Sequence, residues 1–251
     1  MRVISIFICV FLCGSLSEAC AEDITPSFSQ KLDIQVRYDN RSNRPSREQY
    51  RLRYYPSLAL TSTWSVNSFI VTGDDFSSSH NTFGSDTTDY LYARRLYLRH
   101  ETNAGKTELG IIPTYKGRVS STGLSKDGWI TGIRHVRKLQ NNTALEIVVG
   151  QLANAEASEA FNVGEEDEYF EIEYSAKMGG RHSYEASFER MLNGTFARAE
   201  YRFRINEEDT AFVELVQRTD ESAAKIVVGT SGEFAASAFN TSYPIEYFAY
   251  Y

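Results

Sequence analysis

Apolar and polar residues alternate with a period of two along most of this chain. The clearest example is the stretch 197–205, where apolar residues alternate with Arg198, Glu200, Arg202 and Arg204. Successive side chains of a strand point to opposite faces, so this pattern predicts a strand with one apolar and one charged face. No segment carries the spacing of an amphipathic helix over three turns, and we therefore expect an all-β protein.

The predicted strands and their connectors indicate a transmembrane antiparallel β-barrel. We expect strands near residues 31–40, 49–60, 64–73, 89–101, 106–113, 128–138, 143–152, 168–177, 181–191, 195–205, 209–217 and 222–229. Most are about ten residues long, the length of a tilted strand that crosses a bilayer. Short connectors alternate with long ones, as in outer-membrane barrels, and the long ones are 41–48, 74–88, 114–127 and 153–167.

The C-terminal segment makes the strand count uncertain. Tyr243, Tyr247 and Tyr251 belong to an alternating run that ends in an aromatic residue, which would be a thirteenth strand. Bacterial single-chain barrels have an even number of strands. We therefore expect about 12 strands and leave 14 open. The weakest part of the prediction is 54–60, because Pro56 interrupts it.

A soluble β-sandwich or lipocalin-like barrel would show the same alternation. The strand lengths and the densely charged second face favour the membrane barrel. Aromatic residues near the predicted strand ends also fit the interfacial girdles of such barrels, and they are Tyr54, Tyr55, Trp64, Tyr90, Tyr92, Trp129 and Tyr169.

The N-terminus has the features of a secretory signal peptide. Arg2 precedes an apolar run that is too short to span a bilayer, and an Ala-x-Ala site ends at Ala21. We expect residues 1–21 to be removed, leaving 22–251 as the barrel domain. The alternative is a lipoprotein anchored at Cys20. All three cysteines lie in this segment, so the predicted mature chain has no thiol for catalysis, disulfides or metal binding.

Composition removes further classes of function. The net charge is −7, whereas nucleic-acid binding favours a basic domain. Aromatic residues make up 13% of the chain, which argues against disorder.

If the apolar faces meet lipid, the charged faces line the interior. The candidate pore-lining residues are Arg37, Arg51, Arg53, Arg95, Arg99, Arg134, Arg198, Arg202, Arg204, Glu171, Glu173, Glu185 and Glu189, accompanied by Asp33, Glu108, Glu146, Glu200 and Glu214. Arginines dominate the first strands and glutamates the strands over 143–191, which would place a field across a pore. The alternative is a lumen plugged by ion pairs.

Two further features bear on the lumen. Lys116, Arg118 and Lys126 lie in the 114–127 connector, which could fold into the mouth as a constriction loop. Arg94 falls on the apolar face, so it either snorkels to the interface or marks a β-bulge.

Two predicted hairpins resemble known proteins. The segments QYRLRYYPSLALTSTWSVNSFIVTGDD (49–75) and DYLYARRLYLRHETNAGKTELGII (89–112) are similar to the opening hairpins of a Gram-negative outer-membrane porin family. In size the chain is similar to the KdgM-type oligosaccharide channels, which have 12 strands and arginine tracks. The resemblance implies passage of anionic sugars, although the many glutamates here depart from it.

An enzyme is not expected. Some 12-stranded outer-membrane barrels are lipid hydrolases, which need a serine and a histidine close together. None of the four histidines (His80, His100, His135, His182) stands in such a pattern, and no G-x-S-x-G, metal-binding or cofactor motif occurs.

The sequence therefore predicts an outer-membrane, porin-like channel for passive diffusion of small polar or anionic solutes, with no cofactor or metal. A closed barrel with a structural or envelope role and, less favoured, a lipid hydrolase remain open. Expected partners are outer-membrane lipid, lipopolysaccharide, the solutes, and the barrel-assembly machinery through the segment ending at Tyr251.

Overall fold

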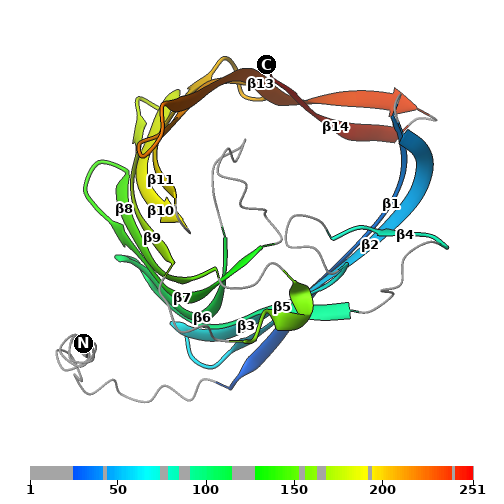
Figure 1. The fold of residues 1–251 in the computed structure, drawn as a ribbon, viewed down its shortest axis with the longest axis horizontal. Helices are drawn as coiled ribbons and strands as arrows, with labels where there is room; N and C mark the ends of the chain where they lie inside the picture. Colours follow the sequence, from blue (N-terminus) through cyan, green and yellow to red (C-terminus); the bar gives the residue numbers. More distant parts are fainter. Residues whose placement is uncertain are drawn as a thin grey trace.

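The fold is a single antiparallel β-sheet that curls around an interior (Figure 1). The computed structural model describes residues 25–41, 44–73, 79–84, 91–114, 128–152, 156–162, 168–191, 194–238 and 241–250. Its elements are β1 (Ser27–Arg41), β2 (Arg44–Ala59), β3 (Trp64–Thr72), β4 (Asn81–Thr82), β5 (Leu91–Thr102), β6 (Gly105–Pro113), β7 (Trp129–Lys138), β8 (Thr143–Gln151), η1 (Ala157–Glu159), β9 (Tyr169–Met178), β10 (His182–Met191), β11 (Gly194–Arg204), β12 (Thr210–Arg218), β13 (Ala223–Ala238) and β14 (Thr241–Tyr250). Within these residues, no helix has the length and apolarity needed to cross a membrane.

Thirteen of the fourteen strands form the wall, each paired with its neighbours in chain order. The remaining strand, β4, pairs with β2 through Tyr50 and Asn81. Successive wall strands are antiparallel, so the first and last strands of an odd-numbered series, β1 and β14, run in the same direction. Among the described residues these two strands are the edges of the sheet.

All twelve predicted strands are confirmed, and the C-terminal run forms β14 as the thirteenth wall strand. The doubtful strand is present as β2. Pro56 pairs with Gln30 of β1, while the ladder to β3 skips from Tyr54 to Ser57. Proline has no N–H to donate, so the interruption falls where the ladder would need one.

The expectation of a long connector at 41–48 is wrong. Arg41 of β1 pairs with Arg44 of β2, so the two strands continue as an extended hairpin with a very short connection. The residues 45–48 are exposed. A hairpin end whose two faces both meet water has no apolar face, so its sequence does not alternate between apolar and polar residues. The uniformly polar composition of 41–48 therefore suggested a loop. The other long connectors all lie at one end of the wall, and the 153–167 connector contains η1.

A β-bulge explains Arg94. The register between β3 and β5 shifts between Phe69 and Ile70, and Arg94 is the extra residue of β5. Arg94 is completely buried, and its guanidinium lies 5.5 Å from the ring centre of Trp129 and donates to the carbonyl oxygen of Gly73. Of the two alternatives for this residue, the bulge is confirmed and snorkelling is wrong.

The wall has its polarity reversed relative to a water-soluble barrel. Neighbours along β6 illustrate it, because Leu109 is 56% exposed whereas Glu108 is 0% exposed. We call the face that carries the charged, buried side chains the inner face and the opposite one the outer face. Apolar residues are exposed along the outer face on most wall strands, including Leu32, Ile34, Val36, Leu96, Ile133, Ile172, Phe188, Val213 and Ile226. An apolar surface of this extent is favourable against lipid rather than water.

A row of glycines brings three strands close on the inner face. Gly110, Gly132 and Gly150 lie directly opposite one another on β6, β7 and β8. A Cβ atom at Gly132 would lie 2.1 Å from the carbonyl oxygen of Val149, so only glycine fits there. Tyr97 and Tyr169 occupy the paired positions at the two ends of this row, on β5 and β9.

Candidate functional site: the charged inner face

The predicted pore-lining residues gather on the inner face. Arg95, Arg134, Arg198, Glu171 and Glu189 are buried there. The partly exposed members are Arg37, Arg51, Arg53, Arg99, Arg202, Glu173 and Glu185, whereas Arg204 is exposed at the end of β11. The predicted loop residues Lys116, Arg118 and Lys126 lie outside the described residues.

One cluster, the Arg134 cluster, consists of Arg99, Lys106, Glu108, Arg134 and Glu146. Glu108 accepts hydrogen bonds from Arg99 at 2.9 Å and from Arg134 at 3.0 Å. Arg134 also donates to Glu146 at 2.9 Å and to the carbonyl oxygen of Pro113 at 2.8 Å. Lys106 lies 3.4 Å from Glu108. With three cations and two carboxylates from β5 to β8, this part of the lumen is close to charge balance.

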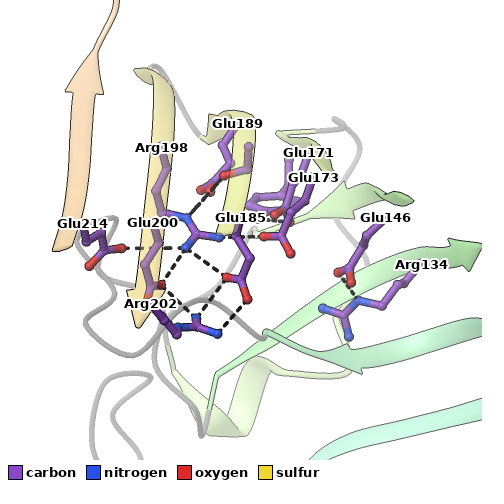
Figure 2. Close-up of polar contacts among 12 residues, drawn as sticks. Arg134, Glu146, Glu171, Glu173, Glu185, Glu189, Arg198, Glu200, Arg202 and Glu214 are labelled. Atoms are coloured by element: carbon purple, nitrogen blue, oxygen red, sulfur yellow. Dashed lines mark hydrogen bonds and ion pairs between the residues drawn. The ribbon is translucent and has the colours of Figure 1, made fainter. Parts of the chain in front are cut away.

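A second cluster, the Arg198 cluster, lies on β9 to β12. Its members are Arg198, Arg202, Glu171, Glu173, Glu185, Glu189, Glu200 and Glu214, all of which point into the same space (Figure 2). The Arg198 guanidinium lies 2.6 Å from Glu173 and between 3.5 and 3.8 Å from four further carboxylates. Arg202 lies 3.0 Å from Glu185 and 2.5 Å from Glu200.

The β1–β5 side of the inner face is rich in arginine. Arg37 donates to Gln49 at 2.9 Å, and Gln49 in turn donates to Thr82 of β4 at 3.1 Å. Arg53 lies 3.7 Å from Asp33 on the neighbouring strand. Side chains from β1, β2 and β5 therefore contribute positive charge, whereas the strands of the Arg198 cluster contribute mostly carboxylates.

Arg95 is held by the wall itself. Its Nε donates to the carbonyl oxygen of Gly128 at 2.8 Å, and its guanidinium lies 4.6 Å from the ring centre of Phe69. These contacts fix a cation on the inner face at the end of the barrel that carries the long connectors, since both Gly128 and the start of β5 lie there.

Sequence reasoning missed an apolar cluster on the inner face. Ile112, Ile130, Val148 and Tyr169 pack together there, with Tyr97 against them. The Tyr169 hydroxyl donates to Glu171 at 2.8 Å, which ties this cluster to the Arg198 cluster. The available signal was a break in alternation, because apolar residues are adjacent at 111–112, 129–130 and 148–149.

The predicted aromatic girdle is only partly correct. Trp64 is 40% exposed at the start of β3 and packs against His100 with tilted rings, whose centres are 4.5 Å apart. Trp129 and Tyr169 are 3% and 1% exposed, so the interfacial position expected for them is wrong. Trp129 packs with Ala157 of η1 and with Ala160, the residue that follows η1.

Two histidines of the described strands contact hydroxyl groups near the ends of the wall. Among the described residues, no group of three or more His, Cys, Asp or Glu side chains could hold a metal ion. His135 contacts the Thr107 hydroxyl at 2.9 Å, and His182 contacts the Tyr201 hydroxyl at 2.6 Å. Both contacts lie near the strand ends that carry the short turns.

The β12–β13 turn at the opposite end is held by an exposed ion pair. Arg218 donates to both carboxylate oxygens of Asp220 at 3.1 Å, and the backbone N–H of Thr195 donates to Asp220 at 3.3 Å. The hydrogen bonds from Arg218 hold the pKa of Asp220 below its ordinary value.

Solved structures that share the fold of this chain include mutants of a porin. A mutant porin of Rhodopseudomonas blastica superimposes with a TM-score of 0.54 at 12% identity, covering 85% of this chain and 81% of its own. An A116K mutant of the same porin gives 0.53 at 11% identity, with coverages of 84% and 80%. A structure titled "Asymmetric conductivity of engineered proteins" gives 0.55 at 11% identity, with coverages of 90% and 84%. No family model and no curated protein matches the chain. The likeness establishes a porin-type barrel fold.

Proposed function

We propose that this chain is an outer-membrane channel for passive diffusion of small polar or anionic solutes. The observation that carries the proposal is the reversed polarity of the wall, in which apolar side chains cover the outer face and charged side chains cover the inner face. An apolar exterior is favourable in hydrocarbon, and a charged interior is favourable only where water or counter-ions reach it.

Partial exposure of the inner charges favours an open lumen over a plugged one. The side chains of Arg99, Arg202 and Glu185 are 28%, 21% and 21% exposed although all three form ion pairs. A dry plug of ion pairs would leave such groups buried, because every charge must be desolvated to make it. The competing role is a closed structural barrel, and the buried pair of Glu108 and Arg134 is the feature that suits it.

The arginines on β1, β2 and β5 support the proposal that anionic solutes are among those that pass through the channel. Rings or rows of arginine favour anions in a pore. We place the protein in the outer membrane, in contact with lipid and lipopolysaccharide, and we expect the assembly machinery to use the segment that ends at Tyr251. No catalytic step is proposed.

Swelling of liposomes that contain the refolded protein tests the channel. Folding is verified first by the shift in gel mobility between unheated and boiled samples. Neutral and anionic sugars are then compared in pairs of equal size, over a series of sizes. Both classes should enter the liposomes, and the rate of entry should fall as the sugars become larger. Arg95→Glu combined with Arg99→Glu should slow the anionic sugars more than the neutral ones. A folded protein that admits neither class would overturn the proposal in favour of the closed barrel.

A further inference from the structure

Four directly opposed residues form a row on the outer face, at the end of the wall that carries the short turns. His100 of β5 lies opposite Trp64 of β3 and Thr107 of β6, and Thr107 lies opposite His135 of β7. We call these four residues the histidine row. Directly opposed residues on one face of a sheet have Cβ atoms about 5 Å apart, so a single ligand can contact several of them.

The side chains of the histidine row contact one another in pairs. The ring centres of Trp64 and His100 are 4.5 Å apart, and the Thr107 hydroxyl lies 2.9 Å from Nδ1 of His135. Trp64 and His135 are exposed, whereas His100 and Thr107 are half-buried. The row therefore presents an indole, imidazoles and a hydroxyl to the surroundings of the wall.

The histidine row marks the border of the apolar outer face. Toward the middle of the wall, the next outer-face residues of β6 and β7 are Leu109 and Ile133, which are 56% and 43% exposed. Toward the turns, the next outer-face residue of β7 is Arg137, which is also exposed. Tryptophan and arginine at such a border are typical of a lipid–water interface. The row therefore lies at the depth expected for lipid headgroups.

The outer face around the histidine row carries no carboxylate. From β3 to β12, the described outer-face residues of the strands include no Asp or Glu. Glu101, which follows His100, belongs to the inner face and lies opposite Lys106. Arg137 lies opposite Gly105 and Leu145, neither of which carries a charge. A guanidinium, imidazoles and a hydroxyl on a face without acidic residues complement a phosphate group.

We propose that the histidine row and Arg137 bind the phosphate of an anionic phospholipid in the leaflet that surrounds the short turns. Thr107, His135 and Arg137 contact the headgroup, and the acyl chains follow Leu109 and Ile133 toward the middle of the wall. Short turns face the periplasm in outer-membrane barrels, so the ligand is a phospholipid of that leaflet and not lipopolysaccharide. This inference rests on the membrane location within the proposed function and names one lipid partner.

Quenching of Trp64 fluorescence by brominated phospholipids tests the inference. The chain has two tryptophans, and Trp129→Phe leaves Trp64 as the reporter within the row. The refolded protein is placed in vesicles of phosphatidylcholine that contain increasing fractions of brominated phosphatidylglycerol or, in parallel, brominated phosphatidylcholine. Phosphatidylglycerol should quench more strongly at equal fractions, although the net charge of −7 by itself disfavours an anionic lipid.

The variants assign this preference to the row. Arg137→Gln should lower the preference for phosphatidylglycerol by about fivefold, the contribution of one arginine at an anionic lipid surface. Arg137→Gln combined with His135→Gln should leave no preference. The matched controls are Arg190→Gln, which removes an exposed outer-face arginine at the other end of the wall, and His80→Gln, whose imidazole contacts Gln35. Both controls should keep the preference of the wild type.

The outcomes separate this inference from the proposed channel, because the readout is lipid contact and not current. Equal quenching of Trp64 by the two lipids would overturn the phosphate site and leave the channel standing. A preference that falls equally in Arg137→Gln and Arg190→Gln would also overturn the site, because net charge would then explain the effect. If Trp129→Phe does not refold, the same titration is made without that substitution, since Trp129 is only 3% exposed and adds a nearly constant signal.

Discussion

The Arg134 cluster allows a quantitative prediction about the wall. Glu108 is 0% exposed and contacts Arg99 at 2.8 Å, Arg134 at 3.0 Å and Lys106 at 3.4 Å. Removing one partner of a buried pair costs about 3–5 kcal/mol. In Arg134→Gln, Glu108 keeps Arg99 and Lys106, so we expect the lower end, about 3 kcal/mol. In Glu108→Gln, Arg134 keeps Glu146, and the expected loss is about 2 kcal/mol, the value of a hydrogen bond to a charged group.

The two substitutions should not be additive. Once Glu108 is neutral, losing Arg134 no longer strands a carboxylate, so the double variant should be more stable than the sum predicts by about 1–3 kcal/mol. The assay is urea unfolding of the protein in lipid vesicles, followed by tryptophan fluorescence, with the slope of the transition checked for each variant. The control is Arg218→Gln, whose exposed pair with Asp220 should change the midpoint little. A coupling below about 0.5 kcal/mol, the usual error of additivity, would refute the view that these residues form one buried network.

Three further predictions concern the backbone and the edges of the sheet. Gly132→Ala should destabilise the barrel by about 1–3 kcal/mol or prevent refolding, because its Cβ would lie 2.1 Å from the Val149 carbonyl oxygen. The milder comparison is Gly84→Ala, where a Cβ meets no atom within 4 Å although φ is +74°. Equal losses of stability in the two variants would argue against the close approach at Gly132. The amide of Thr195 should be protected from hydrogen exchange at neutral pH and should lose protection as pH falls through the lowered pKa of Asp220, because the Asp220 carboxylate accepts its hydrogen bond strongly only while ionised. Asp220→Asn should remove this pH dependence. Protection that rises on acidification would contradict the hydrogen bond between Thr195 and Asp220. If β1 and β14 meet in a parallel seam with their first residues side by side, Ser29→Cys with Ser242→Cys should cross-link through a short bismaleimide. Ser29→Cys with Ala249→Cys, seven residues or about 23 Å further along, should not, and the reverse result would contradict this register of the seam.

Local alternation was enough to predict the strands, because each wall strand has one face in each environment. The stretch 197–205 illustrates this, since its charged residues Arg198, Glu200 and Arg202 lie on the inner face. The extended hairpin after β1 could not be predicted in the same way. Residues 45–48 are solvent-exposed on both faces, so neither face selects for apolar side chains.

The site was predictable in its residues but not in its connections. Period two assigns Arg134 and Arg198 to one face, yet only the register between strands determines which carboxylates they meet. Glu171 comes opposite Glu189 because of the length of the β9–β10 turn, and no property of either residue shows it. The apolar cluster around Ile112 and Tyr169 was missed because adjacent apolar residues blur the period that separates the two faces.

The central claim is that the charged face of the wall borders water that carries current, whereas the apolar face borders lipid. The predicted mature chain has no cysteine, so single cysteines can be placed on either face without interference. Ser175 lies on the inner face of β9 opposite Glu185, and Ala186 lies exposed on the outer face of β10 opposite Tyr174. Both residues are small, which makes Ser175→Cys and Ala186→Cys a matched pair.

The most direct test is the single-channel current of these two variants before and after a charged, membrane-impermeant methanethiosulfonate reagent. The account predicts a stepwise change in open-channel current for Ser175→Cys and no change for Ala186→Cys. A change for Ala186→Cys with none for Ser175→Cys would contradict it, since the conducting water would then lie on the apolar side of the wall.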